Sequence, residues 1–365
     1  MNILFDFANL LVCIIIVLIA YKYTIIPRWI AFVLILQSFI PYFLNDFFFP
    51  ASYMSDQFRY FNMVHELRSF NFNYVESYKV SIPAWFWTLL PLPFIETIKS
   101  LGFYNKFIFI ILFIWLYRKR FLSGISLNFI LFYPSLALYT SLSLRDPLIM
   151  TLMIVSIILF IDKKYFISFL ISIPLLYIKF QNFFLILVFF GLFTIYNKKS
   201  FFYRLRYLLL IILMLSIVLF LDDIINTLNY YRGAMFREDG GNMTSLLEIE
   251  NIYDLITIGV SSVSYFLFKP FPWEVNNLFQ LIQSFENIIV FMILFIFTYR
   301  AYRQSSLLTL KWLSFILFSL LVYSLVVFNF GTAARYKFTF IVIYIVGLSY
   351  DLFKLKGYRF GNIFK

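Results

Sequence analysis

Two arginines stand at predicted helix starts, where a cation is unfavourable. Arg145 comes directly before Asp146-Pro147, a pair typical of a first helical turn because Asp suits the cap and Pro suits the first position. Arg335 belongs to the stretch Gly331-Thr332-Ala333-Ala334-Arg335-Tyr336-Lys337, which opens the last apolar run. A helix N-terminus disfavours cations and binds anions, and an arginine fork binds phosphate. The two sites predict a clamp for pyrophosphate, with Lys337 as a further charge.

A structural explanation of the same residues stays open. Asp146 would then be only a helix cap, and the basic side chains would extend toward lipid headgroups or pair with acidic residues elsewhere.

The stretch from Leu221 to Gln280 is a second source of reactive groups. It contains about 60 residues without a convincing membrane crossing, and it holds eight of the 18 acidic residues: Asp222, Asp223, Glu238, Asp239, Glu248, Glu250, Asp254 and Glu274. The same stretch carries the cations Arg232, Arg237 and Lys269, which are further candidates for binding pyrophosphate. A polar insert of this length between apolar runs is either a functional lid or a linker. The apolar segment 249–268 favours a functional lid over a linker. We therefore expect the stretch from Leu221 to Gln280 to form the outer wall of an active site.

The first long loop offers another set of candidates. Tyr60, Met63, Val64 and Leu67 are spaced as on one face of a helix, and the polar face of that helix carries Asp56, Arg59, Asn62 and Glu66. The only histidine of the chain, His65, lies in the same segment. Asp56, His65 and Glu274 are therefore the candidate catalytic groups, and Arg59 is a candidate for binding the anion. A surface helix with a solvated polar face is the open alternative.

The composition indicates the elements that position these residues. The chain is 62% hydrophobic and only 13% charged, whereas soluble domains carry about 25% charged residues. This predicts an all-α polytopic membrane protein, a single integral membrane domain over residues 1–365. Apolar runs of spanning length occur about eleven times, near 4–20, 29–44, 102–117, 125–141, 147–161, 165–180, 182–196, 207–221, 279–298, 312–328 and 338–353.

The charges orient these spans. The segments assigned to the inside carry 18 basic residues and only two acidic ones, Asp162 and Asp351, as the positive-inside rule requires. Loops of about 45–101 and 222–278 then lie outside. One further crossing at 81–96 or at 252–268 would reverse every later loop, so we expect both to be short interfacial or re-entrant segments.

Several partners and cofactors are not expected. The net charge of +12 suggests nucleic acid, but no basic cluster lies in a soluble domain. One cysteine, Cys13, and one histidine offer neither an intrachain disulfide nor a multi-histidine metal site. We therefore expect no nucleic acid, no metal and no cofactor.

Three motifs carry a family resemblance. The Arg-Asp-Pro helix start, the Lys-Pro-Phe-Pro-Trp-Glu run followed by Ser284-Phe285-Glu286-Asn287, and the terminal Gly-Thr-Ala-Ala-Arg-Tyr-Lys resemble the bacterial Wzy-type oligosaccharide repeat-unit polymerases. The resemblance implies a glycosyltransferase related in fold to GT-C enzymes and O-antigen ligases. Its substrates would be undecaprenyl-pyrophosphate-linked O-antigen (lipopolysaccharide) or capsule repeat units, joined at the periplasmic face of the inner membrane. It also implies membrane lipids as surroundings and admits a chain-length regulator protein as a partner. Unlike the ligases, the chain has no histidine in its large late loop, so a histidine base from that loop is not carried over.

Two other functions stay open. A GT-C glycosyltransferase that uses a polyprenyl-phosphate sugar usually carries an acidic pair in its first outer loop, and Asp46 and Asp56 offer one here. A lipid-linked-oligosaccharide flippase, a transporter, is disfavoured because the acidic loop 222–278 is long.

Overall fold

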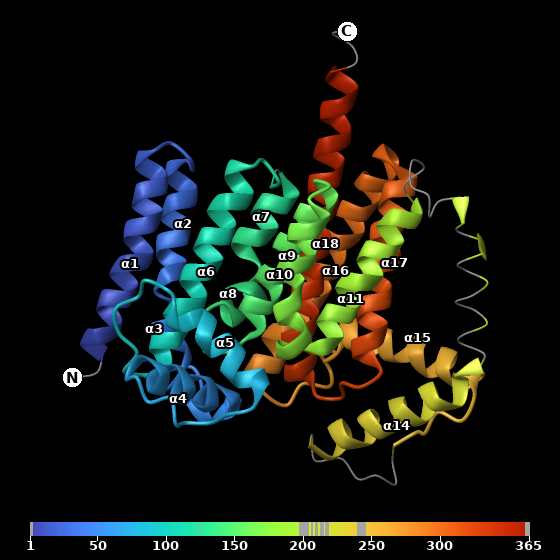
Figure 1. The fold of residues 1–365 in the computed structure, drawn as a ribbon, viewed down its shortest axis with the longest axis horizontal. Helices are drawn as coiled ribbons and strands as arrows, with labels where there is room; N and C mark the ends of the chain where they lie inside the picture. The colour runs from blue at the N-terminus through green and yellow to red at the C-terminus, as the bar shows by residue number, and fades with distance from the viewer. Residues whose placement is uncertain are drawn as a thin grey trace. The chain divides into compact units, whose positions relative to one another are not determined.

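The described part of the chain is entirely helical. The computed structural model describes residues 3–122, 124–196, 204–205, 207–208, 211, 215, 219–238 and 246–361, and within them no strand occurs. Five helices are long and apolar enough to cross a membrane: Phe5–Lys22, Ile98–Arg118, Leu278–Gln304, Ser306–Ser324 and Phe330–Leu355. The predicted class, an all-α membrane protein, is therefore confirmed at this level (Figure 1).

Helices also occupy the other predicted spans within the described residues. These helices are α2 (Arg28–Ser38) with α3 (Ile40–Leu44), α7 (Ile125–Phe132) with α8 (Pro134–Tyr139), α9 (Asp146–Ile161), α10 (Tyr165–Ile178) and α11 (Phe180–Tyr196). The run 125–141 forms two helices because Pro134 forces Tyr133 into an extended conformation. The span expected at 207–221 lies largely outside the described residues. The total of eleven crossings stays a prediction.

The chain divides into two compact units. Unit 1 contains Met1–Ile186 and Ile345–Lys365, and unit 2 contains Leu187–Tyr344. The expectation of one integral membrane domain stays a prediction.

Unit 1 is built around α6 (Ile98–Arg118), which is buried along most of its length and packs against α1 (Ile3–Lys22) and α9 (Figure 1). Its N-terminus is capped by Thr97, whose hydroxyl oxygen accepts a hydrogen bond from the Ser100 backbone N–H. Both hydroxyls donate to the carboxylate of Asp6 on α1, Ser100 at 2.6 Å and Thr97 at 2.7 Å. The buried carboxylate thus joins α1 to the start of α6.

The predicted helix of the first long loop is confirmed. It is α4 (Asp56–Arg68), and its apolar positions Tyr60, Met63, Val64 and Leu67 are all buried. It packs against α5 (Tyr78–Thr88), which has 11 residues. At about 1.5 Å per residue, α5 is roughly 16 Å long, about half the thickness of a bilayer core. As a regular helix it is too short to cross, in keeping with the expected interfacial segment.

Buried amides fix the 140–145 loop, the segment that leads into α9. Asn105 Nδ2 donates to the carbonyl oxygens of Leu142 and Leu144 at 2.6 and 2.7 Å, and Asn105 Oδ1 accepts from the indole of Trp87 at 2.9 Å. Gln57 Oε1 accepts from the Ser143 N–H at 3.1 Å. Because the backbone groups of the 140–145 loop bind side chains of α4 and α6, the loop has one defined course.

Unit 2 contains α14 (Leu221–Glu238), α15 (Ile252–Phe268), α16 (Leu278–Gln304), α17 (Ser306–Ser324) and the first part of α18 (Phe330–Gly361). Helix α15 packs against α17 and α16. The Asn229 side chain of α14 exchanges two hydrogen bonds with the Ile249 backbone, at 2.8 and 3.1 Å. Ile225, Ile249 and Leu325 form a buried apolar cluster beside that contact.

A close approach between α6 and the 140–145 loop yields a stability prediction. A Cβ atom on Gly102 would lie 2.4 Å from the carbonyl oxygen of Ser141. Gly102→Ala is expected to cost about 1–3 kcal/mol of stability, the range for overpacking a close contact. The measurement is the thermal unfolding midpoint of the purified protein in detergent. The control is Gly191→Ala on α11, where no atom lies within 4 Å, and it should be neutral or stabilising. Equal midpoints for the two variants would contradict the assigned packing.

Candidate functional site

Three sequence motifs of unit 2 meet at the buried side chain of Asn287. Its Oδ1 accepts a hydrogen bond from Lys337 Nζ at 2.7 Å. Its Nδ2 donates to the carbonyl oxygens of Lys269 and Phe268, at 2.9 and 3.3 Å. Asn287, Lys337 and the carbonyl groups of residues 266–269 are called the Asn287 junction below. The junction connects the Lys-Pro-Phe-Pro-Trp-Glu run, the Ser-Phe-Glu-Asn turn of α16 and the Gly-Thr-Ala-Ala-Arg-Tyr-Lys start of α18.

The end of α15 explains why these groups come together. The helix stops at Phe268, and Pro270 follows, so its last carbonyl groups lack partners within the helix. Lys337 Nζ donates to two of them, those of Phe266 and Leu267, both at 3.3 Å. A cation at this end also interacts favourably with the helix dipole.

Lys337 is 3% exposed, and its three N–H donors face three acceptors. The structure thus gives Lys337 a role in joining α18 to α15 and α16. Its predicted contact with pyrophosphate stays a prediction.

A half-exposed ion pair lies next to the junction in sequence. Lys269 Nζ is 3.0 Å from Glu274 Oε1 and 4.5 Å from the centre of the Tyr265 ring. The hydrogen bond from Lys269 lowers the pKa of the Glu274 carboxyl, and the N–H of Phe271 acts in the same direction. Glu274 is therefore ionised at neutral pH, the state in which a carboxylate accepts a proton. Its predicted catalytic role stays a prediction.

An aromatic surface lies between these two residues. The rings of Phe271 and Trp273 are stacked at 5.0 Å with an angle of 5° between their planes, and Trp273 is 79% exposed. A flat exposed indole supported by a second ring suits the apolar face of a sugar.

Arg335 lies in the second turn of α18, and its side chain is half-buried. Its guanidinium lies 5.9 Å from the centre of the Tyr336 ring. The first N–H groups of α18 are bound by the Asn329 side chain, whose Oδ1 accepts from Gly331 N at 2.8 Å. The helix thus starts earlier than the predicted stretch, at Phe330, and has its own cap.

The other two arginines predicted in this region bind the protein backbone. Arg232 is 3% exposed and donates to the carbonyl oxygens of Leu325 and Leu247, at 2.8 and 3.0 Å. Burial lowers the pKa of its guanidinium. Arg237 is exposed, and its Nε donates to the Gly233 carbonyl oxygen of its own helix at 3.3 Å. Arg232 is therefore a tether between α14 and the end of α17.

In unit 1, Arg145 directly precedes α9, as predicted, and Asp146 is the first helical residue rather than the cap. Arg145 Nη1 donates to the carbonyl oxygens of Ile178 at 3.0 Å and Lys79 at 3.2 Å. Both acceptors lack a helical partner, because α10 ends at Ile178 and because Pro83 has no N–H for Lys79. These contacts give Arg145 a structural role. Its Nε is buried without a hydrogen-bond partner, and anion binding stays a prediction.

The candidates on α4 lie apart from one another along the helix. Asp56 is its first residue, and His65 stands in its last turn beside the Phe61 ring, at 5.8 Å between ring centres. Arg59 forms an ion pair with Glu76 at 2.7 Å. That contact lowers the pKa of the Glu76 carboxyl and raises that of Arg59. The candidate acids and bases on α4 thus form no single cluster.

Sequence reasoning missed the buried polar groups inside the helices. Lys106 is fully buried in α6, with its Nζ 3.0 Å from Thr140 Oγ1 and 3.4 Å from the Ala137 carbonyl oxygen. The sequence did contain a signal for this residue, because a lysine inside an apolar run needs polar partners within the protein. Across the described segments, no group of three or more His, Cys, Asp or Glu residues is placed to hold a metal ion.

Comparison of the chain with protein-family models, with curated proteins and with solved structures finds no match. Function is therefore inferred from the residues and their geometry.

The Asn287 junction predicts a coupling between two residues. Asn287→Leu removes one acceptor of a buried ammonium and should cost about 1–3 kcal/mol or more. Lys337→Met should also destabilise, because it leaves the amide oxygen and two carbonyl groups unbound. The double variant should lose less than the sum of the single variants, by about 0.5–3 kcal/mol. The measurement is the thermal stability of the wild type, the two single variants and the double variant in the same detergent. Strictly additive losses of stability would contradict the contact between Asn287 and Lys337.

Proposed function

We propose that this chain is a membrane-embedded glycosyltransferase of the Wzy type, which joins undecaprenyl-pyrophosphate-linked oligosaccharide repeat units. The observation that supports this most is the Asn287 junction. It links two of the three motifs that carry the resemblance to this family, the Lys-Pro-Phe-Pro-Trp-Glu run with Ser284-Phe285-Glu286-Asn287 and the Gly-Thr-Ala-Ala-Arg-Tyr-Lys start of α18. The proposal includes about eleven membrane crossings, with the segments 45–101 and 222–278 at the periplasmic face of a bacterial inner membrane.

The reaction needs three contributions from the protein. The acceptor hydroxyl oxygen forms a bond to the anomeric carbon of the donor sugar, and the bond from that carbon to the pyrophosphate oxygen breaks. The electron pair leaves with undecaprenyl pyrophosphate, and the hydroxyl proton passes to a base. The protein must therefore hold the sugar, accept the proton and stabilise the leaving anion.

Unit 2 offers a group for each contribution. Glu274 is the base we favour because its carboxylate directly follows the exposed Trp273 in the chain; its ion pair with Lys269 keeps it ionised but lowers its pKa and thus its basicity. The exposed Trp273, stacked on Phe271, suits the sugar ring. Arg335 is the group we favour for the leaving pyrophosphate, because it lies near the N-terminus of α18 and its side chain is half-buried, whereas Lys337 and Arg232 are buried. Asp56, His65, Arg59 and Arg145 stay candidates in unit 1.

The same geometry limits what the junction itself does. Lys337 is buried and its donors are directed at carbonyl and amide oxygens, so in this proposal it positions the start of α18, which carries Arg335. Asn287 likewise positions the run that carries Lys269 and Glu274. Both are positioning residues rather than groups that contact substrate.

The proposal predicts the effect of two substitutions on glycan length. Arg335→Ala and Glu274→Gln should each collapse long polysaccharide to single repeats in cells that lack the native gene. Removal of one group that stabilises developing charge costs roughly 10²–10³ in rate. Arg335→Lys should restore only part of the length, because an ammonium does not form the bidentate contact of a guanidinium. The measurement is the length distribution of the extracted glycans at matched protein levels.

The control is Arg303→Ala, an exposed arginine in the last turn of α16, the helix that also carries Asn287. It should leave the length distribution unchanged. Wild-type glycan lengths for both Arg335→Ala and Glu274→Gln at normal protein levels would contradict the assigned roles. If cells without the gene contain no assembled repeat units outside the membrane, the protein is a flippase that transports the repeat units and not a polymerase.

A further inference from the structure

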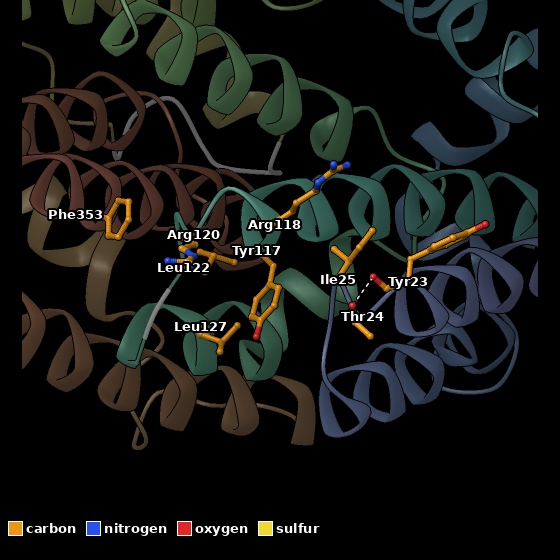
Figure 2. Close-up of a pocket in the computed structure, with 9 residues that line it drawn as sticks. All are labelled: Tyr23, Thr24, Ile25, Tyr117, Arg118, Arg120, Leu122, Leu127 and Phe353. Carbon is orange, nitrogen blue, oxygen red and sulfur yellow. Dashed lines mark hydrogen bonds between the residues drawn. The ribbon is translucent and has the colours of Figure 1, made fainter. Parts of the chain in front are cut away.

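Unit 1 has an open cavity at the end where α6 finishes, the opposite end of that helix from the 140–145 loop. Its volume is about 1100 Å³, and Figure 2 shows the side chains that line it. They come from the turn after α1, the end of α6, the segment that follows it, the first turn of α7 and the later part of α18: Tyr23, Thr24, Ile25, Tyr117, Arg118, Arg120, Leu122, Leu127 and Phe353. Ligand pockets commonly measure about 300–1,000 Å³, so the space admits a sizeable ligand.

Two helix ends of the same kind build the walls of this cavity. After α6, the Phe121 N–H binds the Leu116 carbonyl oxygen at 3.0 Å and the Arg120 N–H binds that of Tyr117 at 2.9 Å. This is a Schellman motif, with Arg120 in the left-handed conformation at φ 59°. The turn after α1 repeats it, with Thr24 at φ 57°. Both ends thus satisfy carbonyl groups that would otherwise repel an anion.

The charge in the cavity is positive and is not neutralised by the protein. Arg118 and Arg120 are exposed, and the side chain of neither forms a hydrogen bond or an ion pair with any residue that the structure describes. The carboxylate of Asp162, which follows α9, is bound by Lys354 at 3.0 Å and by the Tyr350 hydroxyl. The two guanidinium groups are therefore open to an external anion.

The remaining walls are apolar or amphipathic. Ile25, Leu122, Leu127 and Phe353 supply hydrocarbon, and Tyr23 and Tyr117 add rings that each carry one hydroxyl. Figure 2 shows the Arg118 and Arg120 side chains extending away from each other, so each guanidinium group offers its own contact to an anionic ligand that also has an apolar part. Basic pockets between membrane helices bind lipid headgroups in this way.

We propose that this cavity binds a phosphate-bearing anion, for which Arg118 and Arg120 are separate points of contact. The source of the phosphate is the headgroup of an anionic phospholipid or a free phosphate ion, and the apolar walls favour the lipid. The site lies on other residues than the proposed sugar transfer, so either proposal can fail without the other.

The test is retention of ligand by the full-length protein in detergent, followed by native mass spectrometry. The probes are a short-chain phosphatidylglycerol, a short-chain phosphatidylcholine and inorganic phosphate. The variant is Arg118→Ala with Arg120→Ala. The matched control is Lys163→Ala with Lys164→Ala, because Lys163 is also a left-handed residue in a Schellman motif, at φ 64°, and both lysines are exposed and lie outside the cavity.

The wild-type protein and the control should retain phosphatidylglycerol over phosphatidylcholine. The arginine variant should bind phosphatidylglycerol about 30-fold more weakly, the product of roughly fivefold for each basic residue. Arg118→Lys with Arg120→Lys should keep most of the binding and provides a second variant if the first is poorly folded. Displacement of the lipid by millimolar phosphate would assign the site to the free ion.

Two results would overturn the proposal. One is an equal loss of phosphatidylglycerol in the arginine variant and in the lysine control, which would show a general effect of surface charge. The other is a wild-type protein that retains neither phosphatidylglycerol nor phosphate.

Discussion

A buried ammonium among apolar helices needs an acceptor for each of its donors, and unit 2 is organised around one such group. Transfer of an unpaired charge from water into an apolar interior costs far more than one hydrogen bond returns. Lys337 meets this requirement with two carbonyl oxygens at the end of α15 and the amide oxygen of Asn287. That arrangement fixes the end of α15 and the first turns of α18 against α16, and the Lys269–Glu274 ion pair follows directly after α15.

Unbound carbonyl groups set a related constraint across both units. Arg145 binds a carbonyl that Pro83 leaves unpaired, and Arg232 binds carbonyls at the end of α17 and near Ile249. Arg68 does the same after α5, with three carbonyl oxygens within 3.2 Å. Arginine supplies five donors in a fixed fork, which suits several carbonyl groups at once. A basic residue at the end of a helix therefore has an ordinary structural use here, and the two carbonyl contacts of Arg145 weaken the case for an anion clamp at that residue.

Much of the fold could be predicted from the sequence, because length, hydropathy and helical spacing are local properties. The four apolar residues of α4 are buried, as their helical spacing predicted. The prediction of one continuous span over 125–141 did not take into account that Pro134 divides this run into two helices. The partners of buried amides could not be predicted. Asn105 binds Leu142 and Leu144, and Asn287 binds Lys337, which is 50 residues away. Such pairs depend on how the helices pack, which the local sequence does not determine. That Lys106 needs polar partners inside the protein could have been predicted, because it is a lysine within an apolar run.

The most direct test of the account is polymerisation by the purified protein in lipid vesicles supplied with undecaprenyl-pyrophosphate-linked single repeat units. The account predicts a ladder of longer lipid-linked oligosaccharides, with one undecaprenyl pyrophosphate released for each new linkage, and loss of the ladder in Glu274→Gln. Single repeats that remain unlinked, or that only cross the vesicle membrane, would contradict it.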